Sequence, residues 1–332
     1  MNCIVTGSAG FIGSHLTDYL LAKGHEVLGI DNFASGNKEN LKKAFANSNF
    51  KFKEIDVSDL QQLGDISGEF DFLFHLAALA EIVPSIQNPK GYFDANVNGT
   101  FNICEQARRL HVKKIVYAAS SSCYGIPTIY PTSEDAALNP QYPYALTKSL
   151  GEQIVMHWNR VYSVPAISLR LFNVYGERAR TSGNYGAVMG VFLAQKLANK
   201  PLTIVSDGKQ KRDFTFVDDV VRAFYLSAFS ELSGKIYNVG SGNPRRVIEL
   251  AKMISDQEFF FLPKRPGEPE VTFADISSIR RDLGWEPEFS LEEGLIRVLE
   301  SSSDWKNAPV WTPEKIARAT EDWFKYLGEK IE

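Results

Sequence analysis

The stretch that decides the fold stands at residues 3–13 and reads Cys3-Ile4-Val5-Thr6-Gly7-Ser8-Ala9-Gly10-Phe11-Ile12-Gly13. Its apolar start predicts a buried strand over 3–6, and the pattern after it predicts a helix over 11–23. Glycines at such a junction permit a tight turn, close approach of a pyrophosphate and tight packing of helix on strand. The helix N-terminus adds free N–H groups and a positive dipole end. The stretch therefore predicts a dinucleotide site formed by Gly7, Gly10, Phe11, Ile12 and Gly13.

An acidic residue at the expected distance supports this prediction. Asp31 ends the next predicted strand, 18 residues after Gly13. Its carboxylate can accept hydrogen bonds from both ribose hydroxyls of NAD but would repel the 2′-phosphate of NADP, and no arginine stands beside it. The alternative reading is a residue that caps a loop. We favour NAD as the cofactor, with Asn32 as a further contact.

Two later strand ends are expected to complete the cofactor site. Asp56 and Val57 follow the third predicted strand, where they would flank the adenine or, equally well, form an ordinary turn. Leu76, Ala77 and Ala78 end the fourth strand, where small residues would let the cofactor cross the sheet edge.

Strand and helix patterns alternate through the first half of the chain. Strands are predicted over 3–6, 26–30, 50–55, 71–76, 114–118 and 166–169, and helices over 11–23, 38–46, 89–110 and 144–162. Helices of this length between strands indicate parallel crossovers, and continuous apolar runs indicate strands buried on both faces. The run 50–55 alternates instead, which suits a position nearer an edge. We predict an α/β fold with a Rossmann-type doubly wound parallel sheet and a smaller, interleaved α/β substrate domain.

The rhythm becomes rich in loops past residue 172, which indicates a second unit. A helix over 189–198 and a strand over 202–205 are expected there, and a helix over 217–229 and a strand over 236–239 are expected to return to the sheet. The predicted boundaries are 1–172, with 214–240, for the cofactor domain, 173–213 and 241–300 for the substrate domain, and 301–332 for a C-terminal helical extension. An amphipathic helix over 313–328 in this extension would either seal the second domain or form a subunit contact.

The composition excludes several classes of protein. The 332 residues carry a net charge of −4, and the pI near 5.9 leaves no basic excess for a nucleic-acid partner. Cys3, Cys104 and Cys123 form no CxxC pair, so buried thiols are favoured over disulfides or a metal site. With no signal peptide visible and no apolar run long enough to cross a bilayer, we expect a cytoplasmic protein without a membrane partner.

The reactive groups are predicted on the helix over 144–162. Tyr144 and Lys148 stand four residues apart and so share one helix face. A tyrosine with a pKa near 10 is a poor base at neutral pH, and a shift of about three units requires roughly 4 kcal/mol. One ammonium about 4 Å away at an effective dielectric near 20 supplies energy of that order. The spacing alone is weak evidence, but its place after the fifth predicted strand favours a catalytic pair.

A serine run leaves that fifth strand as Ser120-Ser121-Ser122. A hydroxyl at this edge could hold the substrate hydroxyl that Tyr144 deprotonates. Taken alone, the run is explained better as a turn with local backbone hydrogen bonds.

Jointly, the motifs resemble the extended short-chain dehydrogenase/reductase family. The resemblance is colinear from residue 3 to about 299. It is closest to nucleotide-sugar 4-epimerases, above all those that accept UDP-N-acetylhexosamines. The similar motifs are Gly7/Gly10/Gly13, Asp31, His75–Ala78, Ser120–Ser122 with Tyr124-Gly125, Tyr144/Lys148, Arg170–Gly176, Arg212–Phe214, Val217–Val220, Arg265–Glu268 and Leu283–Pro287.

The resemblance implies a role for each matching residue. Tyr144 would be the catalytic base and acid, Lys148 its electrostatic partner and Ser120 the catalytic hydroxyl, with Tyr144 and Lys148 also touching NAD. Arg212 and Arg265 would clamp a pyrophosphate, although either alone could be a surface salt bridge. The implied substrate contacts are Ser120, Ser121, Ser122, Val83, Asn173, Arg212, Arg265 and Thr272. A small residue at Thr272 would admit an N-acetyl sugar, unless it is an ordinary strand threonine.

The reaction that the resemblance implies is transient oxidation at C4 of the sugar by NAD, followed by re-reduction of the 4-keto sugar on its other face. Related dehydratases carry an Asp-Glu pair, and related decarboxylases a Glu, where Ser121 and Ser122 stand, so both reactions are disfavoured. A 4-dehydrogenase and a non-catalytic binding protein stay open as alternatives. The resemblance also implies a homodimer through the helices over 89–110 and 144–162.

Overall fold

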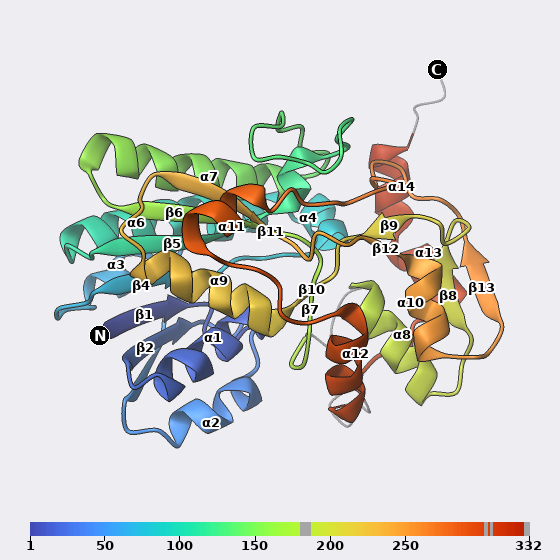
Figure 1. Ribbon diagram of the computed structural model, residues 1–332, viewed down its shortest axis with the longest axis horizontal. Helices are drawn as coiled ribbons and strands as arrows, with labels where there is room; N and C mark the ends of the chain where they lie inside the picture. The colour runs from blue at the N-terminus through green and yellow to red at the C-terminus, as the bar shows by residue number, and fades with distance from the viewer. Residues whose placement is uncertain (180–186, 302–304, 306–307, 329–332) are drawn as a thin grey trace.

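A seven-stranded sheet forms the centre of the first part of the chain (Figure 1). The computed structural model describes residues 1–179, 187–301, 305 and 308–328. Every strand pair in the sheet is parallel, and the order is β11-β6-β5-β4-β1-β2-β3. The strands are β1 (Asn2–Thr6), β2 (Glu26–Asp31), β3 (Phe50–Glu54), β4 (Phe72–His75), β5 (Lys114–Ser120), β6 (Ala166–Leu171) and β11 (Lys235–Val239).

This strand order confirms the predicted doubly wound fold. The chain runs outward from β1 to β3 and then crosses to β4 on the other side of β1. Ligands bind at such a reversal, outside the carboxyl ends of the strands. The alternating strand β3 lies at the edge of the sheet, as its pattern predicted, and its side chains are only partly buried.

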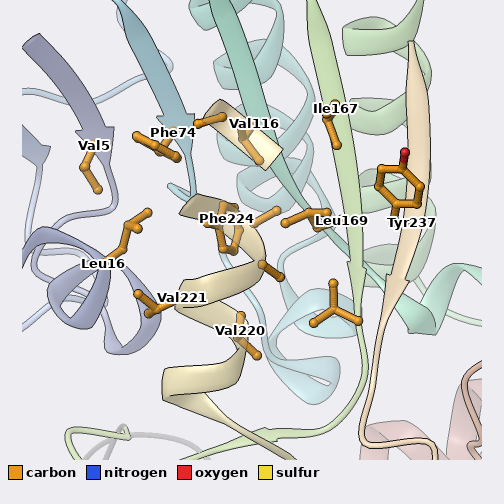
Figure 2. Packing of buried hydrophobic residues seen from close by; sticks show 14 of the residues in the cluster. Val5, Leu16, Phe74, Val116, Ile167, Leu169, Val220, Val221, Phe224 and Tyr237 are labelled. Atoms are coloured by element: carbon orange, nitrogen blue, oxygen red, sulfur yellow. The ribbon is translucent and has the colours of Figure 1, made fainter. Parts of the chain in front are cut away.

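Helices cover both faces of the sheet. One face packs against α1 (Phe11–Ala22), the short turns η1 (Lys38–Leu41) and α2 (Lys42–Phe45), α9 (Val217–Phe229) and α11 (Ser277–Leu283). The other packs against α3 (Leu60–Gly64), α6 (Gly99–Arg109) and α7 (Pro143–Tyr162). Figure 2 shows the first interface, where Leu16 of α1 and Phe224 of α9 lie against the strand residues Val5, Phe74 and Val116. This apolar burial on both faces holds the strand ends in register.

A second apolar core lies beyond the sheet and includes the buried Phe192 and Trp305. It is built from paired short strands and the helices beside them. The strand pairs are β7 (Val174–Tyr175) with β10 (Thr215–Phe216), β9 (Lys211–Arg212) with β12 (Arg245–Arg246), and β8 (Leu202–Val205) with β13 (Phe259–Leu262). The helices are α8 (Val188–Leu197), α10 (Val247–Ile254) and α12 (Leu291–Glu300).

Four segments differ from the helix predictions, and the first is the helix over 38–46, which is divided into η1 and α2. The helix over 89–110 is divided into α5 (Pro89–Phe93), the π-helical turn η2 (Asp94–Asn98) and α6. The segment 82–87, for which no helix was predicted, forms α4 (Ile82–Gln87). The helix over 313–328 is two helices, α13 (Pro313–Ala319) and α14 (Glu321–Leu327). Thr320, with φ −100° and ψ 7°, separates them, and its hydroxyl donates to the carbonyl oxygen of Ile316. Residues 302–304, 306–307 and 329–332 of the predicted extension lie outside the described residues.

The three cysteines are buried and free, as predicted from their scattered positions. In the described part of the chain, no helix is long and apolar enough to cross a membrane. The same residues include no group of three or more histidine, cysteine, aspartate or glutamate side chains arranged to hold a metal ion.

Candidate active site

Two adjoining cavities open at the carboxyl ends of the sheet strands. The first, of about 650 Å³, follows the ends of β1, β2 and β4, and the second, of about 480 Å³, follows β5 and β6. Both volumes fall in the range of about 300–1,000 Å³ that ligand cavities occupy. The two cavities meet at the residues that line both of them, which are Phe11, Ile12, Ala80, Glu81, Val174, Tyr175, Ala187, Met189 and Val191.

The first cavity brings together the residues predicted for the cofactor at the ends of three strands. Its lining includes Gly7, Gly10, Phe11, Ile12, Gly13, Asp31, Asn32, Asp56, Val57, Leu76, Ala77 and Ala78. Tyr144 and Lys148, also predicted to touch the cofactor, lie outside this lining. Tyr144 faces the second cavity, and Lys148 lines neither.

The glycine turn has the geometry that a phosphate site requires. Gly7 has φ +70°, and a Cβ there would lie 2.7 Å from the backbone nitrogen of Ala77. A Cβ on Gly13 would overlap the carbonyl oxygen of Gly7, so this glycine lets α1 pack directly on the turn. Gly10 stands at the N-cap of α1 without a side-chain cap, which leaves the helix N–H groups to a ligand.

Asp31 is held rigidly at the end of β2. One carboxylate oxygen accepts from the backbone N–H of Ala9 at 2.9 Å, and the other accepts from that of Phe33 at 2.8 Å. Burial raises the pKa of Asp31, and these backbone hydrogen bonds oppose the rise. Each oxygen has a second lone pair, so the carboxylate can still accept from two ribose hydroxyls.

Asp56 forms a turn, and its contact with the adenine stays a prediction. Its carboxylate forms a turn with the N–H and hydroxyl of Ser58, at 2.8 and 2.7 Å, and also accepts from the side-chain amide of Asn32. It lines the first cavity at the same time. The glycine turn, the bare helix N-terminus and the Asp31 carboxylate together fit a dinucleotide such as NAD.

Tyr144 stands in the first turn of α7 and faces the serine run across the second cavity. Burial raises the pKa of the Tyr144 phenol, and hydrogen bonds with Ser120 and Ser122 oppose the rise. The hydroxyls of these two serines are 2.8 Å apart, and that of Ser120 also accepts from the N–H of Ser122 at 3.2 Å. The run is therefore both a local turn and a pair of hydroxyls directed at the phenol.

Lys148 lies deeper, one turn along α7. Its ammonium sits 4.4 Å from the centroid of the Tyr117 ring. Burial lowers the pKa of Lys148 to about 7, and the carboxylate of Glu152 opposes this shift. In the chain by itself the pKa of Tyr144 is raised, so its lowering by Lys148 stays a prediction. Burial destabilises the phenolate and also removes charge from the lysine.

His75, which belongs to a motif noted in the sequence, serves as a neutral bridge behind the lysine. Its ring nitrogens lie 2.8 Å from the hydroxyl of Thr6 and 3.0 Å from that of Thr100. Burial lowers the pKa of His75 to about 3, with the charge of Lys148 as a smaller cause. The imidazole is thus uncharged at neutral pH and ties β4 to β1 and α6.

A buried ion pair supports the catalytic helix. The guanidinium of Arg170 on β6 lies 2.6 Å from the carboxylate of Glu152 on α7, and both side chains are 4% exposed. Arg170 also donates to the phenol oxygen of Tyr124 at 2.8 Å, and Ser168 donates to Glu152 at 2.8 Å. The pair fixes α7 against β6 and the segment that follows the serine run.

The second cavity brings together the residues predicted for the substrate. They come from the serine run, α4, the residues after β6, strand β9 and the segment between β13 and α11, and they are Ser120, Ser121, Ser122, Val83, Asn173, Arg212, Arg265 and Thr272. The buried Arg212 is paired with Glu268 at 2.9 Å inside this lining, so it is neither free nor a surface salt bridge. Thr272 is not a strand threonine. Its hydroxyl donates to the amide oxygen of Asn173 at 2.6 Å, which leaves the amide N–H donors of Asn173 for a ligand.

Several lining residues were missed by the sequence analysis. Tyr142 and Trp323 line the second cavity, Glu81 lines both, and Trp305 and Trp311 line the first. They come from loops and from the C-terminal extension, where no motif marks them. Gln210 was missed as well: it lines the second cavity, and its buried amide oxygen has no hydrogen-bond partner among the described residues.

Comparison with known proteins places this architecture among characterised ones. The model of the NAD dependent epimerase/dehydratase family matches residues 3–240. The UDP-glucose 4-epimerase of Mycolicibacterium smegmatis is 39% identical over 310 residues, which cover 90% of this chain and 98% of that protein. Proteins named as a UDP-glucuronic acid decarboxylase and a dTDP-glucose 4,6-dehydratase match as well.

Two solved structures show the same likeness in three dimensions. The UDP-glucose 4-epimerase of Thermotoga maritima with UDP-glucose superposes with a TM-score of 0.86 at 33% identity, covering 92% of this chain and 99% of that chain. The UDP-N-acetylglucosamine 4-epimerase of Methanobrevibacter ruminantium, in complex with UDP-N-acetylmuramic acid, superposes with a TM-score of 0.85 at 31% identity, covering 92% and 97%.

Proposed function

The chain belongs to the NAD-dependent epimerase/dehydratase family with NAD as its cofactor, and from this premise we propose that it is a 4-epimerase of a UDP-hexose or UDP-N-acetylhexosamine. NAD-dependent chemistry on a nucleotide sugar is what the named members have in common. The 4-epimerase reaction and the UDP moiety are the parts that we propose.

The observation that carries the proposal is the group formed by Tyr144, Ser120 and Ser122 in the second cavity, which adjoins the cavity that fits NAD. Bound NAD supplies a hydride acceptor and donor. In its phenolate form, Tyr144 would take the proton of the sugar hydroxyl at O4, and the phenol so formed would later return it, while the hydroxyl of Ser120 orients that oxygen. Lys148, with its pKa lowered to about 7, lies beneath as a group that can gain or lose charge near neutral pH.

The residues around Tyr144 favour epimerisation over elimination or decarboxylation. Ser121 and Ser122 line the cavity with hydroxyls, which cannot serve as carboxylate acids or bases. The carboxylates in the described lining are Glu268, which is paired with Arg212, and Glu81, which begins α4. Glu81 lines both cavities, so its carboxylate is the group to test as an acid or base for elimination of water. The Glu81→Gln variant removes that carboxylate.

The other end of the second cavity suits a nucleoside diphosphate. Arg212, Arg265 and the amide donors of Asn173 all line it, and guanidinium and amide N–H groups are donors that phosphate oxygens accept. An anchored diphosphate would leave the sugar free to turn and present its other face to the cofactor. The small side chain of Thr272 supports an N-acetyl sugar as substrate.

The decisive test is proton NMR of the purified protein with UDP-glucose and UDP-N-acetylglucosamine, without added reductant. We expect an equilibrium mixture of the two C4 isomers of one of these sugars. Tyr144→Phe should slow the reaction at least about 100-fold, because it removes the proton-transfer group. Tyr162→Phe, at the exposed end of the same helix, is the matched control. A keto sugar that accumulates, or a loss of water that Glu81→Gln abolishes, would refute the epimerase proposal.

We also propose that the chain forms a homodimer through α6 and α7. Both helices expose large apolar side chains, among them Phe101 on α6 and Leu146, Val161 and Tyr162 on α7. Light scattering should give twice the chain mass, and Phe101→Glu with Tyr162→Glu should give the monomer mass. Ile296→Glu, at an exposed apolar position on α12, should leave the mass unchanged. A monomeric mass for the unaltered chain would refute this proposal.

A further inference from the structure

We infer that helix α14 of the C-terminal extension is part of the substrate site, and that Trp323 is a positioning residue for Arg265. The inference rests on the proposed function, in which Arg265 binds the diphosphate of the nucleotide sugar. It assigns the extension a role in binding, which neither of the two readings of its sequence included.

Trp323 holds both the backbone and the side chain of the arginine loop. Its indole N–H donates to the carbonyl oxygen of Pro266 at 2.7 Å. The guanidinium of Arg265 lies 5.3 Å from the centroid of the indole ring. Trp323 is 3% exposed, and both side chains line the second cavity. An aromatic face under a planar guanidinium restricts its orientation, so the N–H donors are arranged before a phosphate arrives.

Helix α14 is also anchored on the opposite wall of the cavity. Asp322 accepts a hydrogen bond from the side-chain amide of Gln87 on α4 at 2.8 Å. The two helices, which are labelled in Figure 1, contact one another. Helix α4 carries Val83, a predicted substrate contact that lines the second cavity. Helix α14 therefore contacts both α4 and the loop that carries Arg265.

A row of aromatic rings links the extension to the catalytic tyrosine. The Tyr142 ring lies 6.4 Å from that of Trp323 and 6.4 Å from that of Tyr144, to which it is nearly parallel at 9°. The direct contacts of Trp323 are with the arginine loop, however. Loss of the indole should therefore weaken nucleotide binding and raise KM more than it lowers kcat.

The length of the chain agrees with an added element. The Thermotoga maritima enzyme is matched over 99% of its chain by 92% of this one, so some residues of this chain lie outside that match. An extension that only sealed the second domain would affect folding but not the affinity for a nucleoside diphosphate. That difference makes the inference testable.

The test is calorimetric titration of UDP, dTDP and GDP into the full-length, NAD-loaded protein. Arg265→Gln should weaken the tightest-binding nucleotide at least tenfold, and Trp323→Leu about tenfold. The double variant Trp323→Leu with Arg265→Gln should bind the nucleotide no more weakly than Arg265→Gln alone, because both substitutions remove the same interaction. Phe324→Leu, at the next and more exposed position of α14, should stay within twofold of the unaltered chain.

Trp323→Phe keeps an aromatic face under Arg265 but removes the N–H that binds Pro266. We expect Trp323→Phe to weaken nucleotide binding two- to fivefold. If Trp323→Leu does not fold, Trp323→Phe replaces it in the titrations. The inference would be overturned if the Trp323 variants bound the nucleotide as tightly as Phe324→Leu does. It would also be overturned if the loss of affinity in the double variant equalled the sum of the losses in Trp323→Leu and Arg265→Gln. Failure of the unaltered chain to bind any of the three nucleotides would overturn the proposed function with it. Failure of epimerisation alone would leave these titrations, and the inference, standing.

Discussion

Neutralising Glu152 should destabilise the fold through the buried arginine that it leaves behind. In the wild-type chain the guanidinium of Arg170 lies 2.6 Å from this carboxylate, with both side chains 4% exposed. Glu152→Gln preserves the size of the side chain but leaves a buried guanidinium without its carboxylate partner. Removing one member of such a pair costs about 3–5 kcal/mol, because the remaining charge is buried without compensation.

The double variant Glu152→Leu with Arg170→Met tests the reason for this cost. It removes both charges together, so no buried charge is left unpaired. Replacing a buried ion pair with apolar residues of similar volume is often neutral or stabilising. We therefore expect the double variant to be more stable than either single variant, with a coupling energy of about 2–3 kcal/mol.

The assay is urea unfolding followed by tryptophan fluorescence at a fixed NAD concentration, because bound cofactor adds to the apparent stability. Glu286→Gln breaks the exposed pair with Arg280 and is the control, with an expected loss below about 1 kcal/mol. A loss below about 1 kcal/mol for Glu152→Gln would refute the reasoning. So would a double variant whose loss equals the sum of the two single losses.

Three further predictions concern the cofactor site and the buried histidine. Gly13→Ala would force α1 away from the carbonyl oxygen of Gly7, so the protein should purify without NAD and unfold at a lower temperature; an NAD content equal to that of wild type would contradict this. Asp31→Ser removes the charge that repels a 2′-phosphate, so the Kd for NADP relative to NAD should fall at least about tenfold in fluorescence titrations. An unchanged ratio would mean that Asp31 only caps its loop. His75 has its pKa lowered to about 3, whereas the unfolded chain titrates it near 6.5. Between these values the unfolded state binds a proton that the folded state does not, so stability falls as the pH falls. Between pH 7.5 and 5.5, His75 accounts for a decrease of about 1.4 kcal/mol in the free energy of unfolding. In His75→Gln this part of the pH dependence should disappear, as measured by urea unfolding at several pH values. If the free energy of unfolding changed equally with pH in His75→Gln and in the wild-type chain, the assignment would be contradicted.

The sequence by itself determined the features whose chemistry is local. The glycine turn, the helix after it and the carboxylate of Asp31 stand at the carboxyl ends of predicted strands. Because such ends meet at one edge of a parallel sheet, the sequence alone shows that these groups lie together. Tyr144 and Lys148 share one face because four residues make about one helical turn. For the same reason the parallel sheet and the NAD site could be located from patterns of a few residues.

Only the tertiary structure decided the properties that depend on partners far apart in the chain. The carboxylate of Glu268 lies against Arg212, 56 positions away, and the indole of Trp323 lies under Arg265, 58 positions away. No spacing rule links such residues, because the loops between them can bring any of several side chains to the same place. The pKa values of Tyr144 and Lys148 were also set by the fold, because water is excluded from both groups only when the surrounding helices and strands have packed.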